Sequence, residues 1–151
     1  MSKELPEMTP HIKKVLMLKD LLCVQNELQA VVKSSKNPFF KSSYADLNAH
    51  IAMVKPLLAK YGFILEQPTT VLNGANGFEN AVISRVIHTE TGEARESVFL
   101  LPANTDMQKL GGAVTYARRY TLSALLGMQA EDDDANKATG KTKAKRTSEL
   151  F

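Results

Sequence analysis

The sequence predicts an α+β domain in which a three-stranded antiparallel meander packs on a helix, with further helices at its N-terminal side. Apolar and polar residues alternate with period two from residue 63 to residue 101, which is typical of strands. Apolar residues recur at helical spacing over residues 10–33 and again after Asp106. A meander followed by a helix gives a β-β-β-α core.

The first helix is expected over residues 10–33, because Thr9 can act as its N-cap and Pro10 can occupy its first turn. Its apolar residues fall into two sets on different sides: Ile12, Val15, Leu16, Leu22 and Cys23 in one, and Met17, Leu21, Val24, Leu28 and Val31 in the other. A helix that is apolar on two sides needs two packing partners. Another subunit and a second element of the same chain both meet that need, so both interpretations stay open.

Basic and aromatic residues are interleaved between residues 33 and 45. Phe39, Phe40 and Tyr44 alternate with Lys36 and Lys41. Single-stranded DNA is bound by such mixtures, because cations hold phosphates and rings stack on bases. Rings in a loop also attach the loop to the core, so the second interpretation stays open. Lys41 and Tyr44 are candidate DNA contacts.

Asp46 is expected to cap a second helix that runs to about Tyr61 and is closed by Gly62. Three strands then follow, in FILEQPTTVL (63–72), NAVISRVIHT (80–89) and EARESVFLLP (93–102). The segments NGANG and TETGE between them contain the glycines that hairpin turns use for positive φ angles.

The helix after Asp106 carries the paired arginines. Helical spacing places one stripe toward the core: Leu110, Ala113, Val114, Ala117, Thr121, Ala124 and Leu125. Arg119 then points away from the core, with Thr115 and Tyr116 on the same outer face. A phosphate could approach this face and accept hydrogen bonds from the guanidinium and the hydroxyls.

Arg118 falls on the flank of the same stripe, where an unpaired charge would be costly. We therefore expect a carboxylate partner and a structural role for Arg118. Leu122 and Leu126 fall outside the main stripe, which predicts a second apolar surface over this helix, such as another subunit.

Four consecutive acids, Glu131, Asp132, Asp133 and Asp134, suggest a nuclease with carboxylate-bound magnesium. Consecutive acids in a loop cannot all point at one ion, and no second carboxylate cluster with a catalytic lysine accompanies them. Ion pairing with arginine of this or a neighbouring subunit, and a weak divalent-cation site that modulates DNA binding, are the two other uses that stay open. No cofactor is expected.

The chain has 151 residues with 44% hydrophobic content, enough for one core. We expect a flexible segment over residues 1–9, one domain over 10–136 and a basic tail over 137–151. The tail holds five of the 19 basic and one of the 16 acidic residues, so the rest is close to neutral and the net charge of +3 does not itself indicate DNA binding. A solvated end and an accessory DNA-binding role for the tail both stay open.

One cysteine, no apolar run of 18 residues and no secretory signal predict a soluble, cytoplasmic protein.

Two blocks of the sequence resemble one family. GGAVTYARRYTLSALLG followed by EDDDAN is similar to the signature of the ERF (essential recombination function) family of phage-type single-strand annealing proteins, and residues 37–63 resemble its other block. The likeness spans roughly residues 10–136. AVTYARR also resembles the DNA-contacting helix of eukaryotic RAD-type annealing proteins. Arg119 corresponds to a cation there, whereas Tyr120 stands where that group has a second basic residue.

The resemblance implies a non-enzymatic protein that coats single-stranded DNA and pairs complementary strands without nucleotide hydrolysis, as a ring or filament of many subunits. It also implies a cell that a phage has infected or that carries a prophage, with host or phage recombination proteins as further partners. The expected DNA contacts are Arg119 first, then Arg118, Lys109, Thr115, Tyr116, Lys41 and Tyr44. Two alternatives are a metal-dependent nuclease and an oligomeric interaction module whose arginines only bridge subunits.

Overall fold

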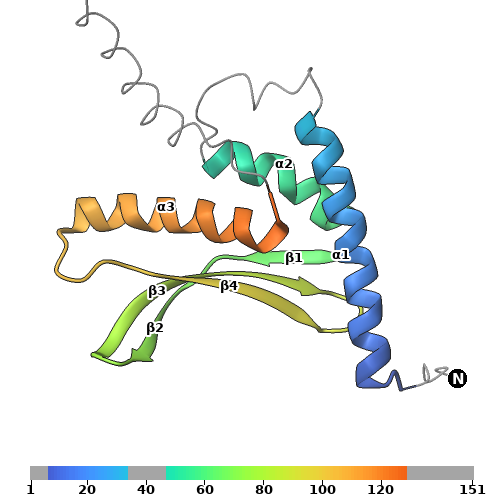
Figure 1. Ribbon diagram of the computed structural model, residues 1–151, viewed down its shortest axis with the longest axis horizontal. Helices are drawn as coiled ribbons and strands as arrows, with labels where there is room; N and C mark the ends of the chain where they lie inside the picture. Colours follow the sequence, from blue (N-terminus) through green and yellow to red (C-terminus); the bar gives the residue numbers. More distant parts are fainter. Residues whose placement is uncertain (1–6, 34–46, 129–151) are drawn as a thin grey trace, which may run out of the picture.

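The computed structural model describes residues 7–33 and 47–128, which form three helices and four strands (Figure 1). In chain order these are α1 (Pro10–Lys33), α2 (Leu47–Lys60), β1 (Phe63–Glu66), β2 (Thr69–Gly74), β3 (Gly77–His88), β4 (Ala94–Leu100) and α3 (Met107–Leu126). The predicted α+β class and the β-meander packed on a helix are confirmed.

The long strand β3 is the centre of an antiparallel sheet. Ile87 is paired with Ile64 of β1 and with β4, and Ala81 is paired with Thr70 of β2 and with β4. A strand residue has only two neighbours across the sheet, so β1 and β2 lie along one edge of β3 and β4 lies along the other.

Residues 63–72 were predicted as a single strand, and this prediction is wrong. They form two strands, β1 and β2, with Gln67 and Pro68 between them. Proline cannot donate a hydrogen bond to a neighbouring strand, so Pro68 interrupts the ladder. The side chain of Gln67 donates to the Arg118 carbonyl of α3. The ladder nevertheless resumes at once, because the Ile83 amide donates to the Pro68 carbonyl at 3.0 Å.

The helices are arranged on one side and at one end of the sheet. Helix α3 lies along one face against β3 and β4, α2 packs on β1 and α3, and α1 packs on α2 and crosses the end of the sheet (Figure 1). Five elements contribute to the core, whose buried residues are Met17, Leu21, Val24, Leu28, Met53, Val54, Leu58, Phe63, Val86, Leu122 and Leu126.

The buried face of α3 differs from the predicted stripe. Leu122 and Leu126 are fully buried among residues of α1 and α2, so their own chain covers them and a second subunit is not needed there. Ala124, which was expected in the core, is exposed. The stripe shifts along the helix because the C-terminal half of α3 meets two helices as well as the sheet.

The described part of the chain buries one of the two apolar sides of α1 and covers the other only in part, since Val15, Leu16 and Cys23 are half-buried there. Met17, Val24 and Leu28 are buried, whereas Ile12 is 47% and Leu22 55% exposed. Burial within the chain therefore accounts for one side and leaves Ile12 and Leu22 of the other side exposed.

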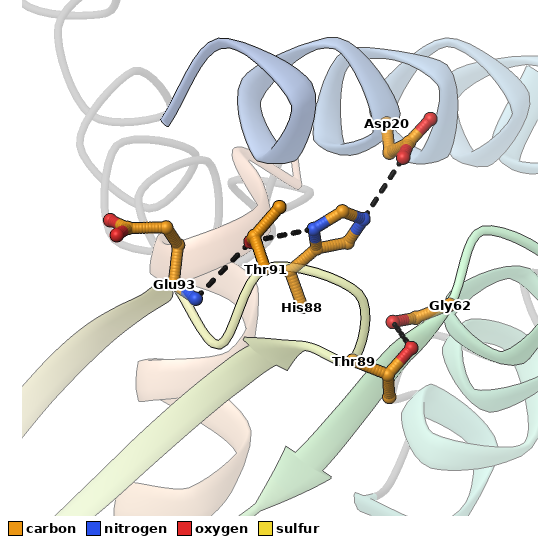
Figure 2. Close-up of polar contacts among 6 residues, drawn as sticks. All are labelled: Asp20, Gly62, His88, Thr89, Thr91 and Glu93. Atoms are coloured by element: carbon orange, nitrogen blue, oxygen red, sulfur yellow. Dashed lines mark hydrogen bonds and ion pairs between the residues drawn. The ribbon is translucent and has the colours of Figure 1, made fainter. Parts of the chain in front are cut away.

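A buried histidine joins α1 to the turn between β3 and β4 (Figure 2). His88 Nε2 hydrogen-bonds to Asp20 Oδ2 of α1 at 2.9 Å, and His88 Nδ1 hydrogen-bonds to Thr91 Oγ1 at 2.9 Å. Thr89 Oγ1 donates to the Gly62 carbonyl at 2.8 Å, and Gly62 has the positive φ of 73° predicted for the residue that closes α2. These bonds fix the end of the sheet against the helices.

Candidate nucleic-acid interface

Helix α3 is closed at both ends by its own sequence. The Asp106 carboxylate accepts from the Lys109 amide at 2.9 Å as N-cap. Gly127 ends the helix with a φ of 64°, and the Met128 amide donates to the Ser123 carbonyl at 2.9 Å. Because both ends are fixed, the faces of the helix between them are defined.

Arg119 and two tyrosines meet on the outer side of α3. The guanidinium carbon of Arg119 lies 5.8 Å from the ring centroid of Tyr116 and 5.5 Å from that of Tyr120. Residues four apart lie above one another on a helix, so the two rings stack, with centroids 4.0 Å apart and an interplanar angle of 28°. Tyr116 remains 44% and Tyr120 41% exposed. The arrangement puts a cation and accessible π surface in one place.

Two further predicted contacts lie toward the N-terminal end of the same helix. Thr115 is exposed, and its hydroxyl donates to the Gly111 carbonyl at 3.2 Å. Lys109 is exposed, with its Nζ 3.4 Å from Asp106 Oδ2. At 1.5 Å per residue, Lys109 and Arg119 are about 15 Å apart along the helix axis. The candidate cations therefore extend along α3.

Arg118 diverges from Arg119 toward the break between β1 and β2. Its Nε donates to Gln67 Oε1 at 3.2 Å. The prediction of a carboxylate partner is therefore wrong, and the partner is an amide. Gln67 Nε2 in turn donates to the Arg118 carbonyl at 2.8 Å. The amide of Gln67 suits this half-buried position because it supplies both an acceptor and a donor. This geometry agrees with a structural role for Arg118, and its predicted DNA contact stays a prediction.

The same glutamine starts a chain of buried hydrogen bonds between the sheet and α3. Gln67 Nε2 donates to Ser84 Oγ at 2.7 Å, and Ser84 Oγ lies 2.6 Å from Thr121 Oγ1. Since Thr121 Oγ1 donates to the Ala117 carbonyl at 2.7 Å, the Ser84 hydroxyl donates to Thr121. The chain sets the position of α3 on β3 and with it the direction in which Arg119 points.

The opposite face of the sheet carries Arg85. Its guanidinium bonds to Glu96 Oε2 at 3.0 Å and lies 3.7 Å from Glu66 Oε2. Two carboxylates therefore offset this charge, which makes Arg85 a weak candidate for binding phosphate.

Several predicted contacts lie outside the described residues: Lys41, Tyr44, Asp132, Asp133, Asp134 and the basic tail. Sequence reasoning missed Gln67, whose strand-like context gave no signal. It also considered Tyr120 only as the residue that replaces the second basic residue of the RAD-type helix. The four-residue spacing from Tyr116 already indicated that the two rings could stack.

Residues 7–33 and 47–128 contain neither a metal-binding cluster nor a membrane-spanning helix. No three His, Cys, Asp or Glu side chains there are grouped so that they could hold a metal ion. None of the helices in these ranges has the length and apolar character needed to cross a membrane.

The fold and this surface define a class: an α+β domain whose sheet-packed helix presents a cation and stacked rings on its outer side. A family model described as the ERF superfamily matches residues 17–149, and the chain therefore belongs to the ERF superfamily. Comparisons with curated proteins and with solved structures find no match. Membership implies phage-type single-strand annealing in recombination and suggests interaction with single-stranded DNA; ERF annealing proteins are generally not enzymes.

Proposed function

We propose that this protein binds single-stranded DNA and anneals complementary strands without ATP, as a homo-oligomer. The observation that carries the proposal is Arg119 beside two partly exposed, stacked tyrosines on the outer side of α3. Membership of the ERF superfamily supports the same activity.

The proposed mechanism rests on which parts of the DNA are held. Arg119, with Lys109 further along the helix, holds phosphates, and phosphate contacts carry no sequence information. The base-pairing edges remain free to meet a complementary strand, so pairing itself supplies the free energy and no nucleotide hydrolysis is required. The protein then contributes alignment of the strand and neutralisation of its charge.

Oligomerisation is supported by apolar surface on two sides. Ile12 and Leu22 of α1 are exposed. On the face of the sheet opposite α3, Ile64, Val98 and Leu100 are between 44% and 50% exposed. Surface of this kind is typical of protein–protein contacts, and a row of subunits would place successive α3 helices along one strand. We place this activity in the cytoplasm of a bacterium that carries the phage.

Two alternatives have direct tests. A nuclease centred on residues 131–134 would cleave labelled DNA in the presence of magnesium or manganese, and we expect no cleavage. An interaction module whose arginines only bridge subunits would lose assembly in Arg119→Ala while the monomer kept its DNA affinity.

The test of the proposal is the salt dependence of Arg119→Ala. We expect weaker binding to oligonucleotides of every sequence and a logarithmic salt slope smaller by about 0.7 for each lost phosphate contact. Lys55→Ala, at an exposed lysine of α2, removes the same unit of charge and is the matched control with near wild-type binding. A loss confined to certain sequences, or an equal loss in the control, would contradict the assignment of Arg119.

A further inference from the structure

Three aromatic rings form a ladder from the sheet to the outer side of α3. Phe99 of β4 meets the Tyr116 ring at 6.0 Å and an interplanar angle of 67°, and Tyr116 stacks on Tyr120 at 4.0 Å. Among the described residues, the ring contacts of this ladder end at Tyr120.

The contact between Phe99 and Tyr116 joins α3 to the sheet, and Tyr120 is the last ring of the ladder. The Phe99–Tyr116 contact attaches α3 to β4, and edge-to-face pairs of this geometry are favourable. Tyr120 touches the ladder only through Tyr116 and keeps 41% of its surface exposed. A large, partly exposed ring at the end of a stack is suited to receive another flat ring.

The position of Arg119 indicates what kind of ring this is. Its guanidinium lies 5.5 Å from the Tyr120 centroid, so a ligand stacked on Tyr120 would have a cation within reach. A flat ring attached to a negative charge is the repeating unit of single-stranded nucleic acid, in which aromatic side chains take the bases and cations take the phosphates.

We propose that Tyr120, backed by Tyr116, stacks one nucleobase of single-stranded DNA whose phosphate Arg119 holds. This inference rests on the proposed function and adds a base-binding subsite to it. Stacking uses the π face of the base and leaves its pairing edge open, so the contact is compatible with annealing. It is also tolerant of sequence, because every base has a π face.

The first test uses the absence of tryptophan from the chain. In Tyr120→Trp the new indole is the sole tryptophan, and we expect its fluorescence to be quenched when oligothymidylate is added. An abasic oligonucleotide of the same length presents the phosphates without the bases and should leave the emission nearly unchanged. Tyr61→Trp, at the end of α2 beside Glu27, is the single-tryptophan control and should not respond to either. Quenching by both oligonucleotides to the same extent, or by neither, overturns the subsite.

The second test separates stacking from packing. We expect Tyr120→Leu to weaken binding of oligothymidylate roughly 5- to 150-fold, the range for loss of one stacked base, and to leave binding of the abasic oligonucleotide unchanged. Tyr120→Phe keeps the ring and should bind like the wild type. An equal loss on both oligonucleotides would assign Tyr120 a structural role. Arg119→Ala should weaken the binding of both oligonucleotides. If the wild-type protein bound neither oligonucleotide, that result would contradict the proposed function as well as this subsite.

Discussion

Adjacent residues on α3 have different tasks because the helix turns about 100° between them. Arg118 points to the break in the sheet and is held by Gln67, whereas Arg119 lies over two tyrosines on the outer side. Thr121 and Thr115 differ in the same way: one is buried in the hydrogen-bond chain to β3, and the other is exposed. The role of each side chain therefore depends on the face of α3 on which it lies.

Thr121→Val tests the buried hydrogen-bond chain. Valine has nearly the same shape but cannot accept from the Ser84 hydroxyl, so a buried donor loses its partner. We expect the free energy of unfolding in urea to fall by about 1–3 kcal/mol. Thr115→Val makes the same chemical change on the exposed face and should stay within about 0.5 kcal/mol of the wild type. Equal effects of the two substitutions would show that the buried chain adds nothing.

At the scale of elements, α1 is joined to the end of α2 by Glu27. Lys60 Nζ donates to Glu27 Oε1 at 2.6 Å, and the Tyr61 hydroxyl donates to the same oxygen. These two hydrogen bonds hold the pKa of Glu27 below its usual value. A carboxyl whose pKa is lower in the folded state stabilises the fold above its unfolded pKa, near 4.5, and loses this effect as the pH falls through the folded value.

Glu27→Gln should therefore be less stable than the wild type at pH 7, and the difference should shrink as the pH falls below 4.5. Because the pair is exposed, the difference in Tm is expected to be small. The measurement is the Tm of both proteins from pH 7 to pH 3. A difference that stays constant across this range would show that the Glu27 charge is not what joins the helices.

The glycine pair at the start of α3 is the second element-scale feature. A Cβ added at Gly111 or Gly112 would meet nothing within 4 Å, so packing within the described chain does not require either glycine. Glycine inside a helix nevertheless costs roughly 0.5–1 kcal/mol relative to alanine. Gly112 lies two turns before Arg119 on the same face, and Gly111 lies two turns before Arg118.

Close approach of a DNA backbone to the Arg119 face would explain Gly112. We expect both Gly111→Ala and Gly112→Ala to raise the Tm, because both remove the helix penalty. Only Gly112→Ala should weaken binding of single-stranded DNA, since only its new methyl group lies in the path of the strand. Equal affinities of the two variants in a fluorescence-anisotropy titration would contradict that path.

At the scale of the whole molecule, local patterns predicted the three helices and the strand region between them, but not the break that divides the first predicted strand into β1 and β2. Period-two alternation located the strands, and Thr9, Pro10 and Gly62 marked helix ends correctly. Contacts between distant elements were not predictable: whether α1 and α2 or another subunit cover Leu126 depends on tertiary packing. For the site, helical spacing placed Arg119 on the outer side, but the partnership of Arg118 with Gln67 arises only because a strand breaks beside α3.

The proposed activity is acceleration of the pairing of complementary strands without nucleotide hydrolysis. The most direct measurement is annealing of two complementary, fluorescently labelled oligonucleotides by the purified protein, without ATP and across a salt series. We expect pairing faster than the spontaneous reaction, an acceleration that fades as salt rises, and a smaller acceleration by Arg119→Ala. Salt-sensitive binding with no acceleration would contradict the claim and leave a protein that only coats the strand.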